Sequence, residues 1–199
     1  MSRPPANRIA VFLFIATVGC GLDLWTKSWI FERVGFPGTP KAFDNEITVI
    51  KGHFSFTTSL NEGALFGLGQ GGGWLFAGLS VAAAVGILYW LFIVGAARDW
   101  LLTVALGCVM AGIFGNLYDR LGLPGLTWPI SPPPPAPHHS GDPVYAVRDW
   151  LYFRTINFPI FNIADSLLVC GAGLLLLHAF VGGRARIEPK VTAKSSDAA

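Results

Sequence analysis

Four long apolar runs alternate along the chain with segments rich in polar residues, glycine and proline. The runs cover about residues 9–22, 74–97, 100–117 and 163–181. Each approaches the roughly 20 residues that a helix needs to cross a bilayer, where backbone groups must hydrogen-bond within their own segment. The pattern predicts an all-α membrane protein with four transmembrane helices. The first helix can continue to Ile30 if Asp23 and Lys27 face protein or water.

The first apolar run also has features of a secretory signal. Arg3 and Arg8 precede it, and a Thr-Val-Gly-Cys sequence ends at Cys20. However, the apolar character continues past Cys20 to Trp25 and Trp29, and no polar mature start follows. We therefore expect this run to be a retained transmembrane helix.

Basic residues are unevenly distributed between the segments that connect the spans. The two tails and the short second loop carry Arg3, Arg8, Arg98, Arg184, Arg186, Lys190 and Lys194. The long loops, at about residues 23–73 and 119–162, carry the other seven basic residues over a much greater length. By the positive-inside rule, both termini and the second loop are cytoplasmic, and the two long loops lie at the outer face of the membrane. We expect one membrane domain over residues 1–183 and a flexible cytoplasmic tail over residues 184–199.

The two long loops differ in character. Residues 47–58 in the first are β-branched, aromatic and partly alternating, which predicts one or two short strands and hence a small β-like cradle outside the membrane. Residues 131–139 in the third are proline-rich, which predicts an extended, semi-rigid segment. This segment ends in His138 and His139, which we interpret as a solvated pair rather than metal ligands.

Composition excludes several classes of protein. Charged residues make up 13% of the chain and the mean hydropathy is +0.52, whereas soluble domains are about 25% charged. The net charge of +2 gives no indication of nucleic-acid binding. The three cysteines, Cys20, Cys108 and Cys170, lie in apolar runs, which favours core positions over disulfides or zinc. With no metal motif or glycine-rich phosphate loop, we expect no cofactor and no metal.

Ionisable and amide side chains gather near the outer ends of the first, third and fourth spans, where they are costly and therefore functional candidates. Each group also has a purely structural interpretation. Asp23 and Lys27 are four apart and could form an ion pair on one helix face. Asn162 could cap the last helix with Asp165 in its first turn. Asp149 could pair with a nearby arginine, Arg148 or Arg154, and Asp119 with Arg120.

Taken together, these groups point to hydrolysis. Asp149 and Asp165 are carried by segments that can meet at the membrane surface, and two acids held close share one proton. One can act as the base that activates water while the other hydrogen-bonds the carbonyl under attack. No serine or cysteine nucleophile with a nearby base is visible, because all four histidines lie elsewhere. The alternatives are a small proton-coupled transporter or channel, and a scaffold in which the acids only cap and pair.

The same motifs resemble those of the lipoprotein signal peptidases (signal peptidase II), a family of bacterial membrane aspartic peptidases. The resemblance rests on Asp23 and Lys27, and on residues 61–66 (Asn-Glu-Gly-Ala-Leu-Phe), 112–120, 147–150 (Val-Arg-Asp-Trp) and 161–166 (Phe-Asn-Ile-Ala-Asp-Ser). Their order follows that of the family, and the match extends from the first span to the fourth.

The resemblance implies a specific activity. The family removes the signal peptide of prolipoproteins just before a cysteine that carries diacylglycerol, beside the membrane lipid, and is inhibited by the cyclic peptide globomycin. The catalytic pair corresponds here to Asp149 and Asp165. The residues that line or brace the site correspond to Asp23, Lys27, Asn61, Gly63, Asn116, Arg120 and Asn162. Asp119 also matches a family acid, but its neighbour Arg120 would hold it ionised. We expect a monomer.

Three departures from the family pattern stand out. Leu65 occupies a position that usually holds alanine, and Ala111 occupies one that is often glycine. Residues 121–146 form a longer segment than usual and contain the proline run. None of the three removes a carboxylate of the pair.

Overall fold

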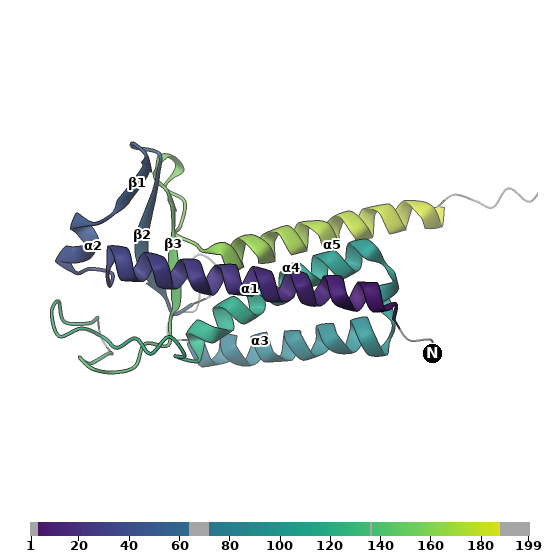
Figure 1. Cartoon of the computed structure of the whole chain (residues 1–199), viewed down its shortest axis with the longest axis horizontal. Coiled ribbons are helices and arrows are strands. Elements are labelled where there is room, and N and C mark those ends of the chain that lie inside the picture. The colour runs from purple at the N-terminus through teal and green to yellow at the C-terminus, as the bar shows by residue number, and fades with distance from the viewer. Residues whose placement is uncertain (1–3, 64–71, 136, 188–199) are drawn as a thin grey trace, which may run out of the picture.

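The computed structural model describes residues 4–63, 72–135 and 137–187, and it consists of a long helical body with a small sheet at one end (Figure 1). The long helices are α1 (Ala6–Val34), α3 (Gly73–Leu88), α4 (Trp100–Arg120) and α5 (Ile163–Ile187), with a short α2 (Pro40–Asp44). The strands are β1 (Ile47–Ile50), β2 (Phe54–Asn61) and β3 (Val147–Phe153). This arrangement confirms the predicted fold class.

Within the described residues, four helical segments are long and apolar enough to cross a membrane: Ala6–Val34, Gly73–Ile93, Trp100–Arg120 and Ile163–Val181. The second includes a π-helical turn, Tyr89–Ile93, after α3. The first is longer than its apolar run because Asp23 and Lys27 are completely buried in protein, so the helix continues through both. The sequence predicted that the first helix would continue to Ile30 only if Asp23 and Lys27 face protein or water, and both face protein.

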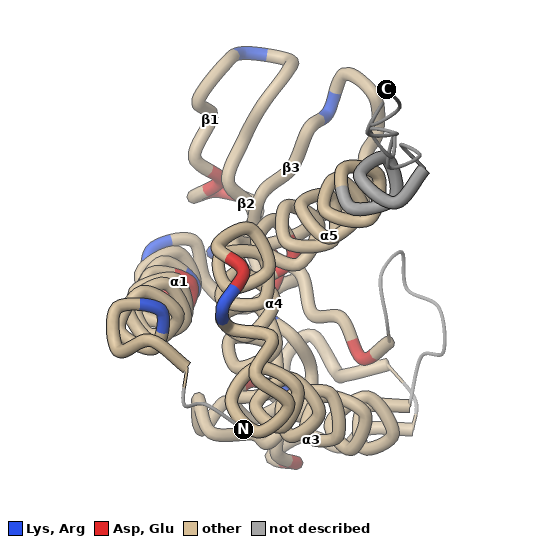
Figure 2. The backbone as a smooth tube through the Cα atoms, turned by 90° about the vertical axis from the view of Figure 1, so that its right-hand side faces the viewer, with Lys and Arg blue, Asp and Glu red and all other residues tan. Residues whose placement is uncertain are grey.

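The helix α4 lies at the centre of the bundle, between α1, α3 and α5 (Figure 2). Two-thirds of its apolar window (67%) is buried inside the protein, against 11–22% for the other three spans. Glycine permits this close packing. A Cβ atom at Gly112 would lie 2.5 Å from the carbonyl oxygen of Ala164 in α5, and one at Gly115 would overlap the Asp23 carboxylate of α1.

The three strands form one antiparallel sheet in the order β1-β2-β3. The two strands in the first loop are confirmed. The third, β3, was not predicted, and the sequence interpretation that placed Asp149 in a loop is wrong. Asp149 pairs with Ser59 of β2, and Val147 pairs with Asn61. The sheet thus brings the start of β3 beside the end of β2.

The proline-rich third loop folds back on itself between residues 126 and 144. Within it, the Trp128 N–H donates to the Asp142 carbonyl and the Val144 N–H donates to the Leu126 carbonyl, both at 2.9 Å. Buried Trp128, Val144 and Ala146 pack on Phe36 and Leu60. We call this segment the insertion hairpin; it is fixed to the sheet end of the molecule.

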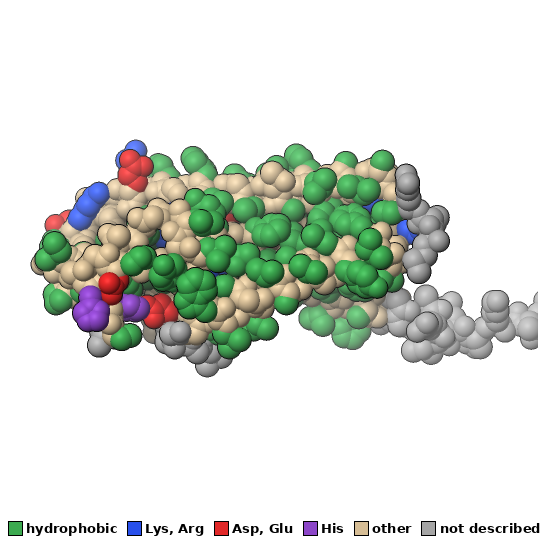
Figure 3. Space-filling view, turned by 90° about the horizontal axis from the view of Figure 1, so that it is seen from below, with side chains coloured by type: hydrophobic (Ala, Val, Ile, Leu, Met, Phe, Trp, Pro, Cys, Tyr) green, Lys and Arg blue, Asp and Glu red, His purple; other side chains and the backbone are tan. Residues whose placement is uncertain are grey.

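Some predicted features lie outside the described residues. Residues 64–66 of the second motif, including Leu65, are among them, as are residues 188–199 of the predicted tail. The helix α5 continues to Ile187, beyond the expected domain boundary at residue 183. Hydrophobic side chains cover the helical body on the face shown in Figure 3. That surface agrees with a body embedded in lipid.

Candidate active site

The start of α5 is fixed by a reciprocal capping arrangement. The Asp165 backbone N–H donates to Asn162 Oδ1 (2.9 Å), and the Asn162 backbone N–H donates to Asp165 Oδ2 (3.3 Å). This is a capping box, which satisfies two backbone donors that the first helical turn leaves unpaired. The structural interpretation of the motif is therefore correct. It also leaves Asp165 Oδ1 free to face the interior, where it accepts a hydrogen bond from Asn116 Nδ2 at 2.8 Å.

The second predicted acid, Asp149, lies in β3 and contacts Asn162 from the sheet. It is 2% exposed, and its Oδ1 accepts a hydrogen bond from Asn162 Nδ2 at 2.6 Å. The Asn61 side chain also hydrogen-bonds it. Because Asn162 contacts both Asp149 and Asp165, the structure brings the two predicted carboxyl groups together although 16 positions separate them in the chain.

The environment of Asp149 favours its neutral form. Burial, followed by the negative charge of Asp165, raises the pKa of Asp149 to about 8. The positive charge of Lys27 and hydrogen bonds from Asn162 and Asn61 lower the pKa of Asp149 but do not cancel this shift. This environment favours the protonated form of the Asp149 carboxyl group near neutral pH.

Asn116 of α4 connects the carboxyl groups to a buried lysine. Its Oδ1 accepts hydrogen bonds from Lys27 Nζ (3.0 Å) and Asn162 Nδ2 (3.1 Å), while its Nδ2 donates to Asp165. Every polar atom of the Asn116 amide is thus used, which fixes its orientation. The predicted site residue Asn116 therefore holds Asp165 from the side opposite the capping box.

Behind this layer lies a buried network of four charges. Lys27 Nζ pairs with Asp23 Oδ2 at 2.8 Å and with Asp119 Oδ2 at 3.0 Å. Asp119 Oδ1 in turn pairs with Arg148 Nη2 at 2.9 Å. Asp23 Oδ1 accepts from the Ala164 backbone N–H at 2.8 Å, in the first turn of α5. The formal charges of the two acids, Asp23 and Asp119, and the two bases, Lys27 and Arg148, sum to zero. The contacts of the network also join α1, α4, β3 and α5.

This network corrects the arginine pairings suggested by the sequence. Arg148 pairs with Asp119 rather than with Asp149. Arg120 Nη2 instead donates to the Gly63 carbonyl at 3.0 Å, and its guanidinium lies 5.6 Å from the centre of the Phe76 ring. The partners of Asp119 are therefore Lys27 and Arg148, and Arg120 is directed to the end of β2.

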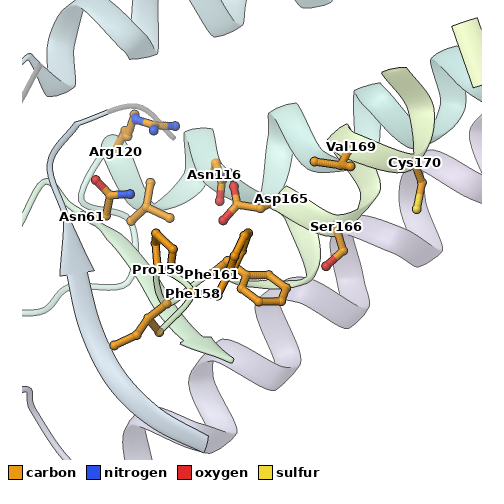
Figure 4. Close-up of a pocket in the computed structure, with 12 residues that line it drawn as sticks. Asn61, Asn116, Arg120, Phe158, Pro159, Phe161, Asp165, Ser166, Val169 and Cys170 are labelled. Atoms are coloured by element: carbon orange, nitrogen blue, oxygen red, sulfur yellow. Dashed lines mark hydrogen bonds between the residues drawn. The ribbon is translucent and has the colours of Figure 1, made fainter. Parts of the chain in front are cut away.

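A cavity of about 490 Å³ opens beside Asp165 (Figure 4). At one end the labelled side chains are polar, with Asn61, Asn116 and Arg120 near Asp165; Val169 and Cys170 lie further along α5. The full lining is Asn61, Asn116, Arg120, Val147, Phe158, Pro159, Ile160, Phe161, Asp165, Ser166, Val169 and Cys170. The cavity can hold an extended, largely apolar ligand with one polar group near Asp165.

Sequence reasoning missed the apolar wall, which residues 158–161 supply between β3 and α5. The only signal was their apolar character directly before the Asn162 motif. Asp149 is not among the lining residues, but it hydrogen-bonds the lining residue Asn61 and also Asn162. Within residues 4–63, 72–135 and 137–187, no cluster of three or more His, Cys, Asp or Glu side chains has the spacing of metal ligands.

Comparisons with known protein families and with curated proteins all point to one family of membrane peptidases. The family model described as signal peptidase (SPase) II matches residues 15–181. A lipoprotein signal peptidase from Rhodopirellula baltica is 47% identical over 182 residues, covering 88% of this chain and 74% of its own. Another from Symbiobacterium thermophilum is 35% identical over 168 residues, covering 83% of this chain and 91% of its own.

Two solved structures of bacterial membrane enzymes have a similar fold. One, determined by the in meso method at 2.3 Å resolution, has a TM-score of 0.71 at 24% identity, over 96% of this chain and 99% of its own. The other, at 1.9 Å resolution, has a TM-score of 0.64 at 26% identity, over 89% and 96%. The helical bundle with its terminal sheet is thus shared across nearly the whole chain.

Proposed function

The chain belongs to the signal peptidase II family, and from this premise we propose that it cleaves by an aspartic mechanism. Membership makes it a multi-pass membrane peptidase that removes signal peptides from prolipoproteins. We infer that the reacting groups are Asp149 and Asp165 and that the cut falls just before a diacylglyceryl-modified cysteine. The observation that carries the proposal is the contact of both carboxyl groups with Asn162 beside the cavity, Asp149 through the Asn162 side chain and Asp165 through the Asn162 backbone N–H.

The two acids have different surroundings, which supports different roles. Asp165 lines the cavity and is the proposed base, which takes a proton from the attacking water. Asp149 is buried and protonated, and is the proposed acid, which hydrogen-bonds the scissile carbonyl as negative charge develops on its oxygen. The proton that Asp165 gains can then pass to the leaving amine. No covalent intermediate is needed.

The remaining predicted site residues position this pair. Asn116 and Asn162 orient the two carboxyl groups by direct hydrogen bonds, and Asn61 contacts Asp149. Arg120 is bound to the Gly63 carbonyl and lines the cavity, where its remaining donors are available to a substrate carbonyl. Asp23 and Lys27 act one step further away, through Asn116 and the backbone of α5.

The cavity also suggests how the substrate lies. Its apolar part runs along α5, whose outward surface is exposed and apolar at Val169 and Leu176. We propose that the acyl chains stay in the adjacent lipid, where burial stabilises them by about 0.8 kcal/mol per CH₂. The basic tails then lie in the cytoplasm, and the sheet and both acids lie at the outer face of the inner membrane. One copy of the chain contains all of these groups, so we propose a monomer.

The transporter or channel alternative finds no support in this geometry. It requires ionisable groups along the midplanes of the spans. The buried charges instead gather where α1, α4 and α5 meet the sheet, in a closed neutral network. That arrangement favours a fixed site over a proton pathway.

Incubating the purified protein with a diacylglyceryl-modified prolipoprotein is expected to release the signal peptide, seen as a size shift on a gel. Globomycin is expected to block the shift, and a chelator to leave it unchanged. The matched control is the same prolipoprotein without diacylglycerol, which should remain uncut. Cleavage of both substrates at equal rates would contradict the proposed specificity, and inhibition by the chelator would indicate a metal.

The pH dependence of cleavage follows from the shared proton. Activity requires Asp149 protonated and Asp165 ionised, so the rate is expected to fall as the pH rises through about 8 and Asp149 loses its proton. It should also fall in acid, once the pair binds a second proton and no carboxylate is left to act as the base. The kcat/KM values measured from about pH 5 to about pH 10 should therefore form a bell, whose limits belong to the pair.

The control for this profile is reversibility: enzyme held at the highest pH and returned to neutral pH should regain full activity. A kcat/KM that keeps rising to the alkaline end, with the enzyme intact, would exclude a protonated carboxyl group from the mechanism.

A further inference from the structure

One histidine of the insertion hairpin forms an ion pair with Glu62, the residue that follows β2. His138 Nε2 lies 2.5 Å from Glu62 Oε1, and the His138 ring stacks on Trp128 with centroids 4.6 Å apart and an interplanar angle of 16°. His139 makes no such contact with β2; its side chain is 85% exposed and pairs with Asp142 of the same hairpin. The prediction that both histidines are solvated is therefore wrong for His138, which pairs with Glu62 outside the hairpin.

Trp128 makes this contact rigid. It is buried in the cluster with Val144 and Ala146, and its ring packs edge-on against Phe36 at 5.7 Å between centroids. Leu60 of β2 belongs to the same packing. The histidine is therefore presented to Glu62 from a fixed indole surface rather than from a freely moving proline segment.

Glu62 lies between two residues that contact the proposed site. On one side, the Asn61 side chain hydrogen-bonds Asp149. On the other, the Gly63 carbonyl accepts the hydrogen bond from Arg120, and the Gly63 N–H donates to Asn61 Oδ1 at 3.0 Å. Any displacement of residue 62 therefore moves both contacts. The histidine and acidic side chains visible together at the sheet end in Figure 3 mark this region.

We propose that Glu62 and His138 form a clamp, with His138 fixed by Trp128, that positions Asn61 and Gly63 for the reaction. Both are positioning residues: they act on Asp149 and Arg120 through the backbone of residues 61–63. The inference rests on the proposed function and gives the long third loop a role in it, as an external support for the site. It assigns no direct contact with substrate to the clamp.

The test compares Glu62→Gln and His138→Gln with the matched control His139→Gln in the full-length protein. Each clamp variant is expected to lower kcat for prolipoprotein cleavage by about 3–5-fold, the scale of a partly exposed ion pair, with little change in KM. His139→Gln is expected to match the wild type. Rates are normalised to the folded fraction, measured by tryptophan fluorescence.

Two further measurements separate positioning from a general loss of structure. In an Asn61→Ala background, His138→Gln should lower kcat by a smaller factor than in the wild type, because one of the two contacts through which the clamp acts is already lost. The reversed pair Glu62→His with His138→Glu should recover kcat to within about twofold of the wild type. Independent, multiplying effects of Asn61→Ala and His138→Gln would overturn the inference, as would equal kcat values for His138→Gln and His139→Gln.

Failure of the clamp and failure of the proposed function give different results. If the wild type cleaves and Asp149→Asn does not, the aspartic mechanism holds whatever the clamp variants do. Wild-type kcat in both clamp variants would then reject the clamp alone. Full activity in Asp149→Asn would reject the proposed function before the clamp is considered.

Discussion

Replacing Asp165 with asparagine is expected to lower kcat for prolipoprotein cleavage by about 10²–10⁴-fold, and replacing Asp149 with asparagine by a similar factor. Asparagine cannot take a proton from water at residue 165, and cannot carry the shared proton at residue 149. Both substitutions keep the shape of the side chain and one acceptor oxygen, for the bond from Asn162 at residue 149 and for the bond from Asn116 at residue 165. The Asp165→Asn change gives up the long bond from the Asn162 N–H but keeps the shorter capping bond, which the backbone of residue 165 donates. The measurement is initial cleavage rate at saturating substrate.

The matched control for these variants is Asp44→Asn, at an exposed carboxylate in α2 far from the cavity lining. It should cleave at the wild-type rate. Thermal unfolding midpoints should be alike for all three variants, which would place the loss in chemistry rather than in folding. A folded Asp165→Asn or Asp149→Asn protein that retains most of its kcat would rule out the proposed pair.

The start of the last span shows what can be predicted from local spacing. Asn162 and Asp165 are three positions apart, which is the spacing of a capping box, and a capping box is what forms. The same holds for Asp23 and Lys27, four apart on one helix face. Helix geometry alone brings such residues together, so these contacts can be predicted from their spacing in the sequence.

The partners of those pairs could not be predicted in the same way. Lys27 meets Asn116 and Asp119 through the packing of α1 on α4, which depends on small residues such as Gly115 rather than on a spacing in the chain. The arginine pairing was wrong for this reason: Arg120 is adjacent to Asp119 in sequence but points to Gly63. Neighbours on a helix differ in direction by about 100°, so adjacency does not indicate pairing.

The sheet shows a second limit. Residues 147–153 are aromatic and β-branched enough for a strand, yet their charged pair, Arg148 and Asp149, made a loop the simpler interpretation. Both side chains are buried in the folded chain, because Arg148 donates to Asp119 and Asp149 accepts from Asn162. A strand whose polar side chains are satisfied only by tertiary contacts has no clear alternating pattern. The same is true of the insertion hairpin, whose contact with Glu62 joins residues 76 positions apart.

The largest effect on stability is expected from Lys27→Met. Methionine fills much of the space of lysine, but it leaves Asp23 without its ion-pair partner and Asp119 with Arg148 alone. Removing one member of a buried ion pair typically costs about 3–5 kcal/mol, because the remaining charge stays buried. The thermal unfolding midpoint in detergent, followed by tryptophan fluorescence, should fall by at least about 6 °C.

The cause of that loss can be tested by restoring the charge balance. Adding Asp23→Asn to Lys27→Met removes the unpaired negative charge, while the asparagine oxygen can still accept the Ala164 N–H. The double variant should therefore unfold at a higher temperature than Lys27→Met alone. The matched control is Lys41→Met, at an exposed lysine that donates to the Glu32 carbonyl, and its midpoint should be that of the wild type. If Lys27→Met and Lys41→Met unfold alike, the buried network does not hold α1, α4 and α5 together, and the support that it gives to Asn116 and the start of α5 must come from packing alone.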